Sequence, residues 1–146
     1  MARTRSLAPA RLLVDTGAFC AQRDPGDKHH AMATAGFSTL AQVACEIYSS
    51  EHVLDETLTL LARRESYRYA AVAGDELLSS RIVHWLDATP AEWRMALRFM
   101  RKYADQSVSF TDCLSFALMK RENIRYVFGF DRHFAAAGFQ LWPGKE

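Results

Sequence analysis

Short apolar runs alternate along this chain with longer segments of helical character, and this alternation restricts the folds open to it. The run at residues 12–14 suits a central parallel strand. Residues 82–88 and the aromatic-rich residues 126–130 alternate as strands do, and residues 139–142 suggest an edge strand. Because strands that alternate with helices pack into α/β folds, we expect a three-layer α/β/α sandwich with a mostly parallel central sheet.

Five segments between these strands carry the spacing or the end signals of helices. In residues 49–64, apolar side chains recur at the spacing of one helical face. Thr89 and Pro90 supply a cap and a first residue for another helix. Asp27 is expected to cap the first helix, and Thr16 with Gly17 to turn the chain after the first strand. The expected helices cover residues 30–44, 49–64, 67–80, 90–100 and 110–121.

Length and composition fit one folded domain. A chain of 146 residues buries roughly 70% of the surface that its unfolded form exposes. Hydrophobic residues make up 49% and charged residues 24%, which is ordinary for a globular protein. No apolar run approaches the roughly 20 residues that span a bilayer, and the basic start lacks a signal-like stretch. We expect a flexible arm at residues 1–10 and one cytoplasmic domain at residues 11–146.

The charge balance excludes attraction of the whole molecule to nucleic acid. The formal net charge is +1, from 18 basic and 17 acidic residues. Arg63 and Arg64 nevertheless stand together after the predicted helix 49–64, where they form either a solvated face or a rim that binds phosphates. The three cysteines are widely spaced and odd in number, which indicates core residues rather than a disulfide framework or a metal site.

Four acidic residues are expected at one edge of the sheet. Asp15 follows the first predicted strand, and Asp131 follows the strand near Val127. In an open parallel sheet the carboxyl ends of the strands border the reactive crevice, so both acids would face the same edge. Glu56 and Asp112 are each expected in the first turn of a helix that enters from that side. The four carboxylates would then converge.

Each of these acids also has an ordinary structural interpretation. Asp15 and Asp131 would cap the helices that follow them, Asp112 completes a Ser-x-x-Asp capping box, and Glu56 would favour a helix start. Taken together, however, four like charges near an apolar edge repel one another, and burial raises their pKa values unless a cation compensates. Mg²⁺ or Mn²⁺ suits such a site, because both are hard cations that prefer carboxylate oxygens.

Four segments in order resemble one family of nucleases. "LLVDTGAF", "VLDETLTLL", "SFTDCLSFAL" and "FGFDRHF" are similar to the motifs of PIN-domain ribonucleases, especially the VapC-type toxins of bacterial toxin–antitoxin pairs. The resemblance extends over residues 11–142. It implies a PIN-like sandwich in which four catalytic acids bind the metal, namely Asp15, Glu56, Asp112 and Asp131.

The resemblance also implies an activity and partners. A Mg²⁺- or Mn²⁺-dependent endoribonuclease would use its metal to lower the pKa of a bound water and to neutralise charge on the phosphate. A small antitoxin would hold the toxin inactive, and the toxin would form a homodimer. Thr16, Arg63 and Arg64 are candidates for binding the RNA substrate. The sequence departs from the family at Gly129, which more often is Thr or Ala and which we expect to touch no acid.

Three other functions fit parts of the pattern. A housekeeping PIN nuclease would carry the same acids without an antitoxin. A PIN module that only binds would be expected to have lost acids, whereas all four are present. A phosphatase with Asp15 as nucleophile, in the manner of haloacid-dehalogenase-like proteins, requires Asp-x-Asp, and the third position here is Gly17.

Overall fold

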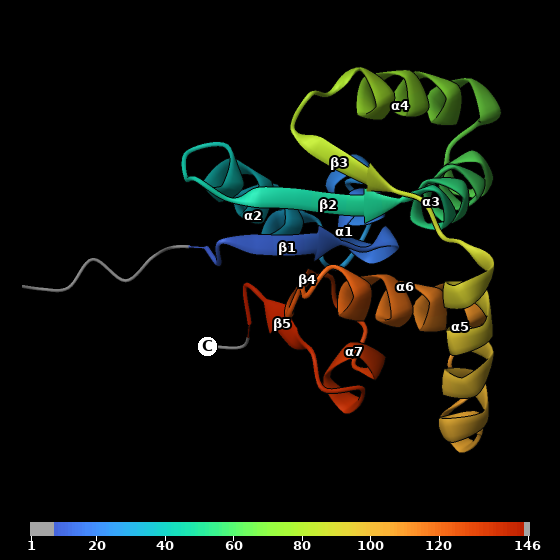
Figure 1. The fold of residues 1–146 in the computed structure, drawn as a ribbon. Helices are drawn as coiled ribbons and strands as arrows, with labels where there is room; N and C mark the ends of the chain where they lie inside the picture. The colour runs from blue at the N-terminus through green and yellow to red at the C-terminus, as the bar shows by residue number, and fades with distance from the viewer. Residues whose placement is uncertain (1–7, 145–146) are drawn as a thin grey trace, which may run out of the picture.

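The structure is a computed structural model that describes residues 8–144. Its five strands form one parallel sheet in the order β3-β2-β1-β4-β5. Their bounds are β1 Arg11–Val14, β2 Glu46–Ser50, β3 Val83–Leu86, β4 Tyr126–Phe128 and β5 Gln140–Trp142. The predicted α/β sandwich is therefore confirmed, and the sheet is parallel throughout (Figure 1).

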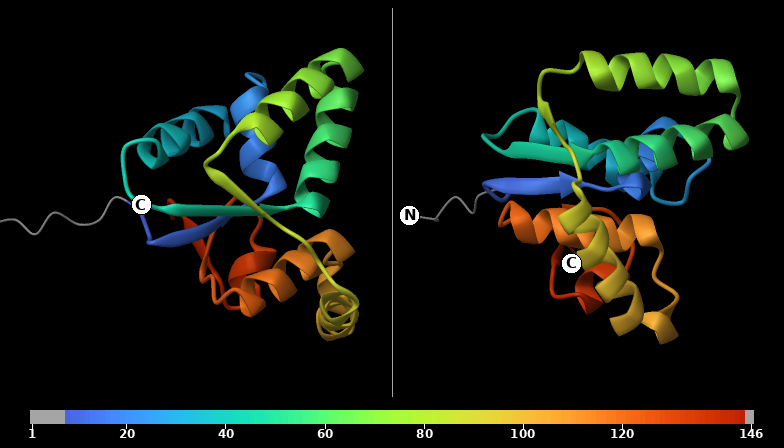
Figure 2. Two further views of the ribbon diagram at one scale, coloured as in Figure 1. Left: turned by 45° about the horizontal axis from the view of Figure 1, so that its top comes forward. Right: turned by 45° about the vertical axis from the view of Figure 1, so that its right-hand side comes forward.

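Helices cover both faces of this sheet (Figures 1 and 2). On one face lie α1 Thr16–Arg23, α2 His30–Leu40, α3 Glu51–Arg64 and α4 Tyr67–Ser79. On the other lie α5 Pro90–Lys102, the short 3₁₀ helix η1 Ala104–Gln106, α6 Phe110–Arg121 and α7 His133–Ala136. None of the helices within residues 8–144 combines the length and the apolar character that a membrane crossing needs.

Alternating side chains of β1 join the two halves of the core. Leu12 and Val14 pack with residues of the first face, whereas Leu13 packs with α5, α6 and α7 on the second. This is the two-residue period of a strand that is buried on both sides. The order of the strands reverses between β1 and β4, so the carboxyl ends of these two strands border a topological switch point.

Helix α1 and strand β2 differ from the sequence prediction. Residues 16–23 form helix α1 where a turn was expected, because Ala18, Phe19, Cys20 and Ala21 are buried together and this packing outweighs the weak helical pattern. Strand β2 was not predicted, although it pairs with both β1 and β3.

Helix α2 is shorter than expected. It ends at Leu40 instead of residue 44, and the backbone N–H of Ala41 donates to the Phe37 carbonyl in the last turn. Its N-cap residue is His29 rather than Asp27. The Asp27 carboxylate accepts a hydrogen bond from the His29 backbone N–H at 2.8 Å, so it fixes the turn before the helix.

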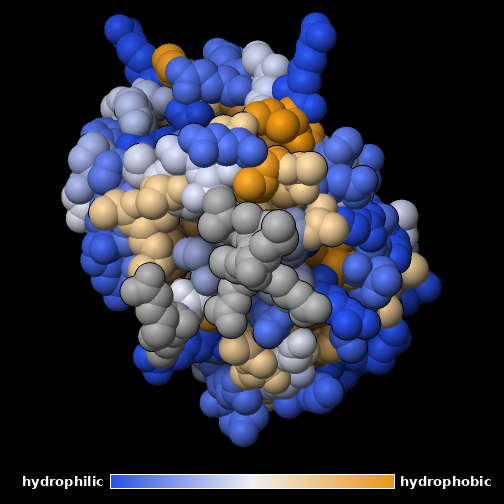
Figure 3. Space-filling model, turned by 90° about the vertical axis from the view of Figure 1, so that its left-hand side faces the viewer, coloured by the Kyte–Doolittle hydropathy of each residue, from blue (hydrophilic) through white to orange (hydrophobic). Residues whose placement is uncertain are grey.

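Only residues 8–10 of the expected N-terminal arm belong to the described part of the chain. Residues 1–7 of the expected arm lie outside the described part of the chain. Ala8 is buried among side chains of the first face, and the carbonyl of Ala10 accepts a hydrogen bond from Glu46. Figure 3 shows the edge at which β1 and β2 begin, and its visible surface is mostly hydrophilic.

Candidate active site

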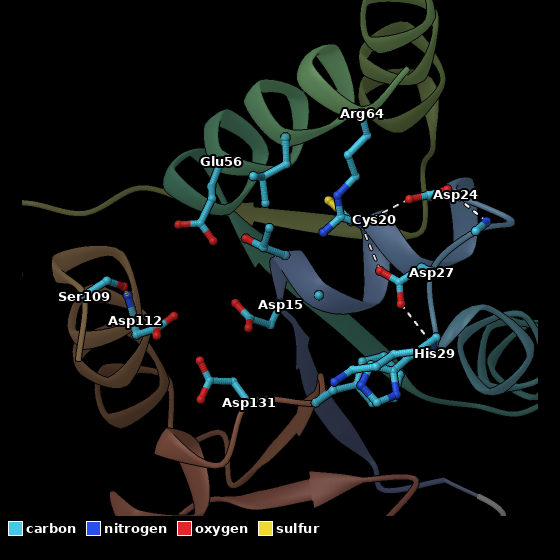
Figure 4. Close-up of a pocket in the computed structure, with 16 residues that line it drawn as sticks. Asp15, Cys20, Asp24, Asp27, His29, Glu56, Arg64, Ser109, Asp112 and Asp131 are labelled. Atoms are coloured by element: carbon cyan, nitrogen blue, oxygen red, sulfur yellow. Dashed lines mark hydrogen bonds and ion pairs between the residues drawn. The ribbon is translucent and has the colours of Figure 1, made fainter. Parts of the chain in front are cut away.

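A cleft of about 620 Å³ opens at the switch point, where β1 and β4 end. All four predicted acids line it, and their side chains point toward a common space (Figure 4). They are Asp15, Glu56, Asp112 and Asp131. We call this the acidic cleft. The structure thus brings together residues that lie on four separate elements or loops of the chain.

Asp15 lies deepest in the acidic cleft. Its backbone N–H donates to the Phe128 carbonyl at 2.9 Å, which ties the end of β1 to β4. The residue is only 4% exposed, and its Oδ1 makes no hydrogen bond with any residue in the described part of the chain. Although Asp15 is the N-cap residue of α1, its side chain makes no capping bond. Burial, followed by repulsion from Asp112, raises the pKa of Asp15 well above its usual value.

Asp112 lies in the first turn of α6, as expected. The cap of this helix is Ser109, whose Oγ accepts a hydrogen bond from the Asp112 backbone N–H at 3.1 Å. The Asp112 carboxyl group itself is buried in the acidic cleft. Burial and then the neighbouring charge of Asp131 raise the pKa of Asp112 to about 7.

Asp131 follows β4 and has a local structural role as well. Its Oδ1 accepts a hydrogen bond from the His133 backbone N–H at 2.9 Å, at the start of α7. The imidazole of His133 turns back toward the acids, with Nδ1 3.1 Å from Asp131 Oδ1 and 3.9 Å from Asp112 Oδ2. The sequence placed His133 beside Asp131 but gave no signal of its proximity to Asp112.

Glu56 lies in the middle of α3 and not in the first turn, so the expected position is wrong. The helix begins at Glu51, five residues before Glu56, because Ser50 Oγ accepts a capping hydrogen bond from the Val53 backbone N–H at 3.2 Å. Glu56 is consequently too far from the helix start to stabilise it through the macrodipole. Its side chain points into the acidic cleft from the side opposite Asp131 (Figure 4).

Gly129 lies directly against Asp15, contrary to the expectation that it touches no acid. A Cβ atom at this position would stand 3.1 Å from Asp15 Cβ and 3.5 Å from Asp15 Oδ2. Sequence separation hid this contact, because pairing between β1 and β4 is what brings the two residues together. Because glycine has no Cβ atom, Gly129 leaves room for the Asp15 side chain in its observed position.

The three predicted substrate-binding residues occupy different environments. Thr16 is buried in the acidic cleft, and its Oγ1 makes no hydrogen bond within residues 8–144. Arg64 also lines the cleft, but its Nη1 is paired with Asp24 at 3.3 Å and with Asp27 at 2.9 Å (Figure 4). Arg63 is exposed and lines a separate depression that also contains Glu56.

The loop between α1 and α2 contributes a wall of the acidic cleft that the sequence did not reveal. The ring of His29 stacks on Phe130, with centroids 4.1 Å apart and planes at 9°. Asp24 and Asp27 hold Arg64 in the same wall. The sequence predicts only a capping role for Asp27 and gives no sign of its ion pair, because its partner Arg64 is distant in sequence.

The fold and the site together define an α/β protein with carboxylates gathered at the switch point of a parallel sheet. Residues 12–140 match the PIN domain family, and the chain belongs to that family. It is 34% identical over 128 residues to the 23S rRNA-specific endonuclease VapC20 of two Mycobacterium tuberculosis strains, which covers 88% of this chain and 95% of the relative.

Solved structures agree with this assignment. The crystal structure of M. tuberculosis VapC20, described as a Sarcin-Ricin loop cleaving toxin, matches with a TM-score of 0.79 and 33% identity. The match covers 88% of this chain and 95% of that one. VapBC2 from Rickettsia felis, crystallised with a DNA fragment from its promoter, matches with a TM-score of 0.65 over 90% and 96% of the two chains. At 17% identity, this match shows only that the two proteins share a fold.

Proposed function

We propose that this protein is a Mg²⁺- or Mn²⁺-dependent endoribonuclease and the toxin of a toxin–antitoxin pair. The observation that carries the proposal is the buried Oδ1 of Asp15, which has no hydrogen-bond partner among residues 8–144 and lies in a cleft with three further acids. A buried carboxylate oxygen without a partner is costly, and repulsion from neighbouring carboxylates adds to the cost. The similarity to VapC20 supports the same activity.

The residues present fit a hard divalent cation. The donors in the acidic cleft are carboxylates, which suit Mg²⁺ and Mn²⁺. Asp15, Glu56, Asp112 and Asp131 would hold the ion, and it would supply a water of lowered pKa and positive charge beside the scissile phosphate. Because the pKa of Asp112 is about 7, binding a cation displaces a proton from that carboxyl group near neutral pH.

Other residues of the chain would position the RNA. We propose that Thr16 Oγ1, which has no hydrogen-bond partner in the described part of the chain, donates to a phosphate oxygen in the acidic cleft. Arg63 would contact the RNA backbone outside the cleft, since it is exposed and near Glu56. Arg64 would act in the cleft wall, where two acids already neutralise its charge.

The partners follow from the same proposal. A small antitoxin protein would block the toxin, and a homodimer would cover apolar side chains that the single chain exposes. Val72 and Leu78 on α4 and Ile82 beyond it are 50%, 61% and 62% exposed. Because its proposed substrate is RNA, we propose that the protein acts in the cytoplasm.

An RNA cleavage assay tests this function. The protein is incubated with a defined RNA pool that includes 23S rRNA, with Mn²⁺ or with EDTA, and the new 5′ ends are mapped. Discrete cuts that require Mn²⁺ are the expected result, whereas intact RNA or cutting that EDTA does not reduce would contradict the proposal. A short antitoxin-like reading frame beside the gene would separate the toxin from a housekeeping nuclease.

A further inference from the structure

His133 carries an imidazole ring, and this ring lies beside two of the four acids, Asp112 and Asp131. Its Nδ1 lies 3.1 Å from Asp131 Oδ1 and 3.9 Å from Asp112 Oδ2. One donor atom from each of these three residues falls within 4.8 Å of the other two. In an octahedral site with bonds of about 2.1 Å, adjacent donors are separated by about 3 Å and opposite donors by about 4.2 Å. The separations of 3.1 Å and 3.9 Å from His133 Nδ1 lie close to these two values.

The Nδ1 atom of His133 is buried and has no hydrogen-bond partner within residues 8–144. Although 3.1 Å is within hydrogen-bonding range, the ring is not oriented to bond Asp131 Oδ1. The His133 backbone N–H already donates to that same oxygen, which fixes the ring beside the carboxylates. A buried nitrogen that faces two acids without a hydrogen bond is placed as a ligand would be.

A second observation concerns Asp15, the deepest acid of the acidic cleft. Asp15 Oδ1 is also buried and unpaired in the described structure, and its side chain points toward Asp112 and Asp131 (Figure 4). A cation bound by Asp15 would therefore lie between Asp15 and the two acids next to His133, Asp112 and Asp131. These two atoms, unpaired within residues 8–144, approach this space from the end of β1 and from α7.

We propose that His133 Nδ1 is a ligand of the metal ion, together with Asp112 and Asp131, so that the site has a nitrogen donor among its oxygens. This inference rests on the proposed metal-dependent function. Mn²⁺ is a first-row transition metal that accepts nitrogen donors beside oxygen donors, whereas Mg²⁺ strongly prefers oxygen. The mixed donor set therefore selects Mn²⁺ over Mg²⁺.

Pulsed electron paramagnetic resonance of the Mn²⁺-loaded protein tests the proposal directly. A coordinated imidazole nitrogen modulates the Mn²⁺ spin echo, and labelling histidine with ¹⁵N changes the modulation frequency. We expect this ¹⁵N-sensitive modulation in the unaltered protein and its loss in His133→Gln. His29→Gln is the matched control, because His29 also lines the acidic cleft, and it should keep the modulation.

Affinities measured by calorimetry provide the second readout. His133→Gln should lose about tenfold or more in Mn²⁺ affinity and little in Mg²⁺ affinity. Bound Mn²⁺ without nitrogen modulation, or modulation that is lost in His29→Gln instead, would overturn this inference and leave the proposed nuclease standing. A protein that binds no Mn²⁺ at all would overturn both. Melting curves in EDTA verify that each variant is folded.

Discussion

The backbone N–H of Asp112 donates to Ser109 Oγ at 3.1 Å, so the hydroxyl of Ser109 caps α6 and the carboxyl group of Asp112 is left to face the other acids. Ser109→Ala should therefore lower the free energy of unfolding by about 1 kcal/mol. Asp112→Asn should instead leave the metal-free protein equally or more stable, by about 1 kcal/mol, because one repelling charge is removed. Urea unfolding of both variants in EDTA measures these changes. A large loss in Asp112→Asn would show that its carboxylate stabilises the helix.

The stability of the metal-free protein should depend on pH in an unusual direction. The folded-state pKa of Asp112 is raised to about 7 and that of Asp15 is raised well above its usual value, whereas both titrate near about 4 in the unfolded chain. From about pH 4 to about pH 7 the folded state thus binds more protons, and these groups make the free energy of unfolding fall as pH rises.

Urea unfolding in EDTA across this pH range measures the effect. Asp112→Asn should flatten the dependence, while Asp75→Asn, which removes an exposed charge on α4, should keep it. A stability that rises with pH equally in all three proteins would contradict the assignment of the two buried carboxyl groups.

Gly129→Ala should weaken Mn²⁺ binding through Asp15. The added Cβ would stand 3.1 Å from Asp15 Cβ, so the carboxylate must shift by a few tenths of an ångström. We expect a few-fold loss of affinity by calorimetry, since a metal ligand tolerates little displacement. Gly17→Ala is the control, because its Cβ would meet Phe130 at an ordinary 3.7 Å. Equal affinities in the two variants would show that Asp15 is not a ligand or is free to adjust.

The two arginines should contribute unequally to RNA binding. Arg63→Gln should weaken binding and reduce the slope of log affinity against log salt by about one unit, as for one lost phosphate contact. Arg64→Gln should change the slope less, because Asp24 and Asp27 already pair with this guanidinium. Fluorescence anisotropy in EDTA, which prevents cleavage, measures both. Unchanged affinity and slope in both variants would place the RNA elsewhere on the molecule.

Much of the fold could be predicted because its signals are local. The capped helices α3, α5 and α6 and the apolar strands β1 and β4 each carry their pattern within a few residues. Helix α1 and strand β2 could not be predicted in this way. The eight residues of α1 are held by burial on the sheet, and β2 is stabilised by pairing with neighbours on both sides.

The candidate site shows the same difference between local signals and contacts that depend on tertiary packing. Asp15 and Asp131 could be predicted at one edge because each follows a strand, and parallel strands end on the same side. The contact of Gly129 with Asp15, the pairing of Arg64 with Asp27 and the approach of His133 to Asp112 depend on tertiary packing. Such contacts between elements leave no periodic pattern in a single sequence.

The thermal shift that Mn²⁺ produces in Asp112→Asn tests the central claim most directly, because Asn caps a helix about as well as Asp but removes one metal ligand. Melting curves are recorded with EDTA and with excess Mn²⁺, beside an RNA cleavage assay, for the unaltered protein, for Asp112→Asn and for Asp75→Asn as the charge control. A ligand that binds only the folded state raises its stability, so Mn²⁺ should stabilise the unaltered protein and Asp75→Asn equally. Asp112→Asn should lose most of this shift and all cleavage. An Asp112→Asn protein that still cuts RNA and gains the same Mn²⁺ shift would contradict the metal site.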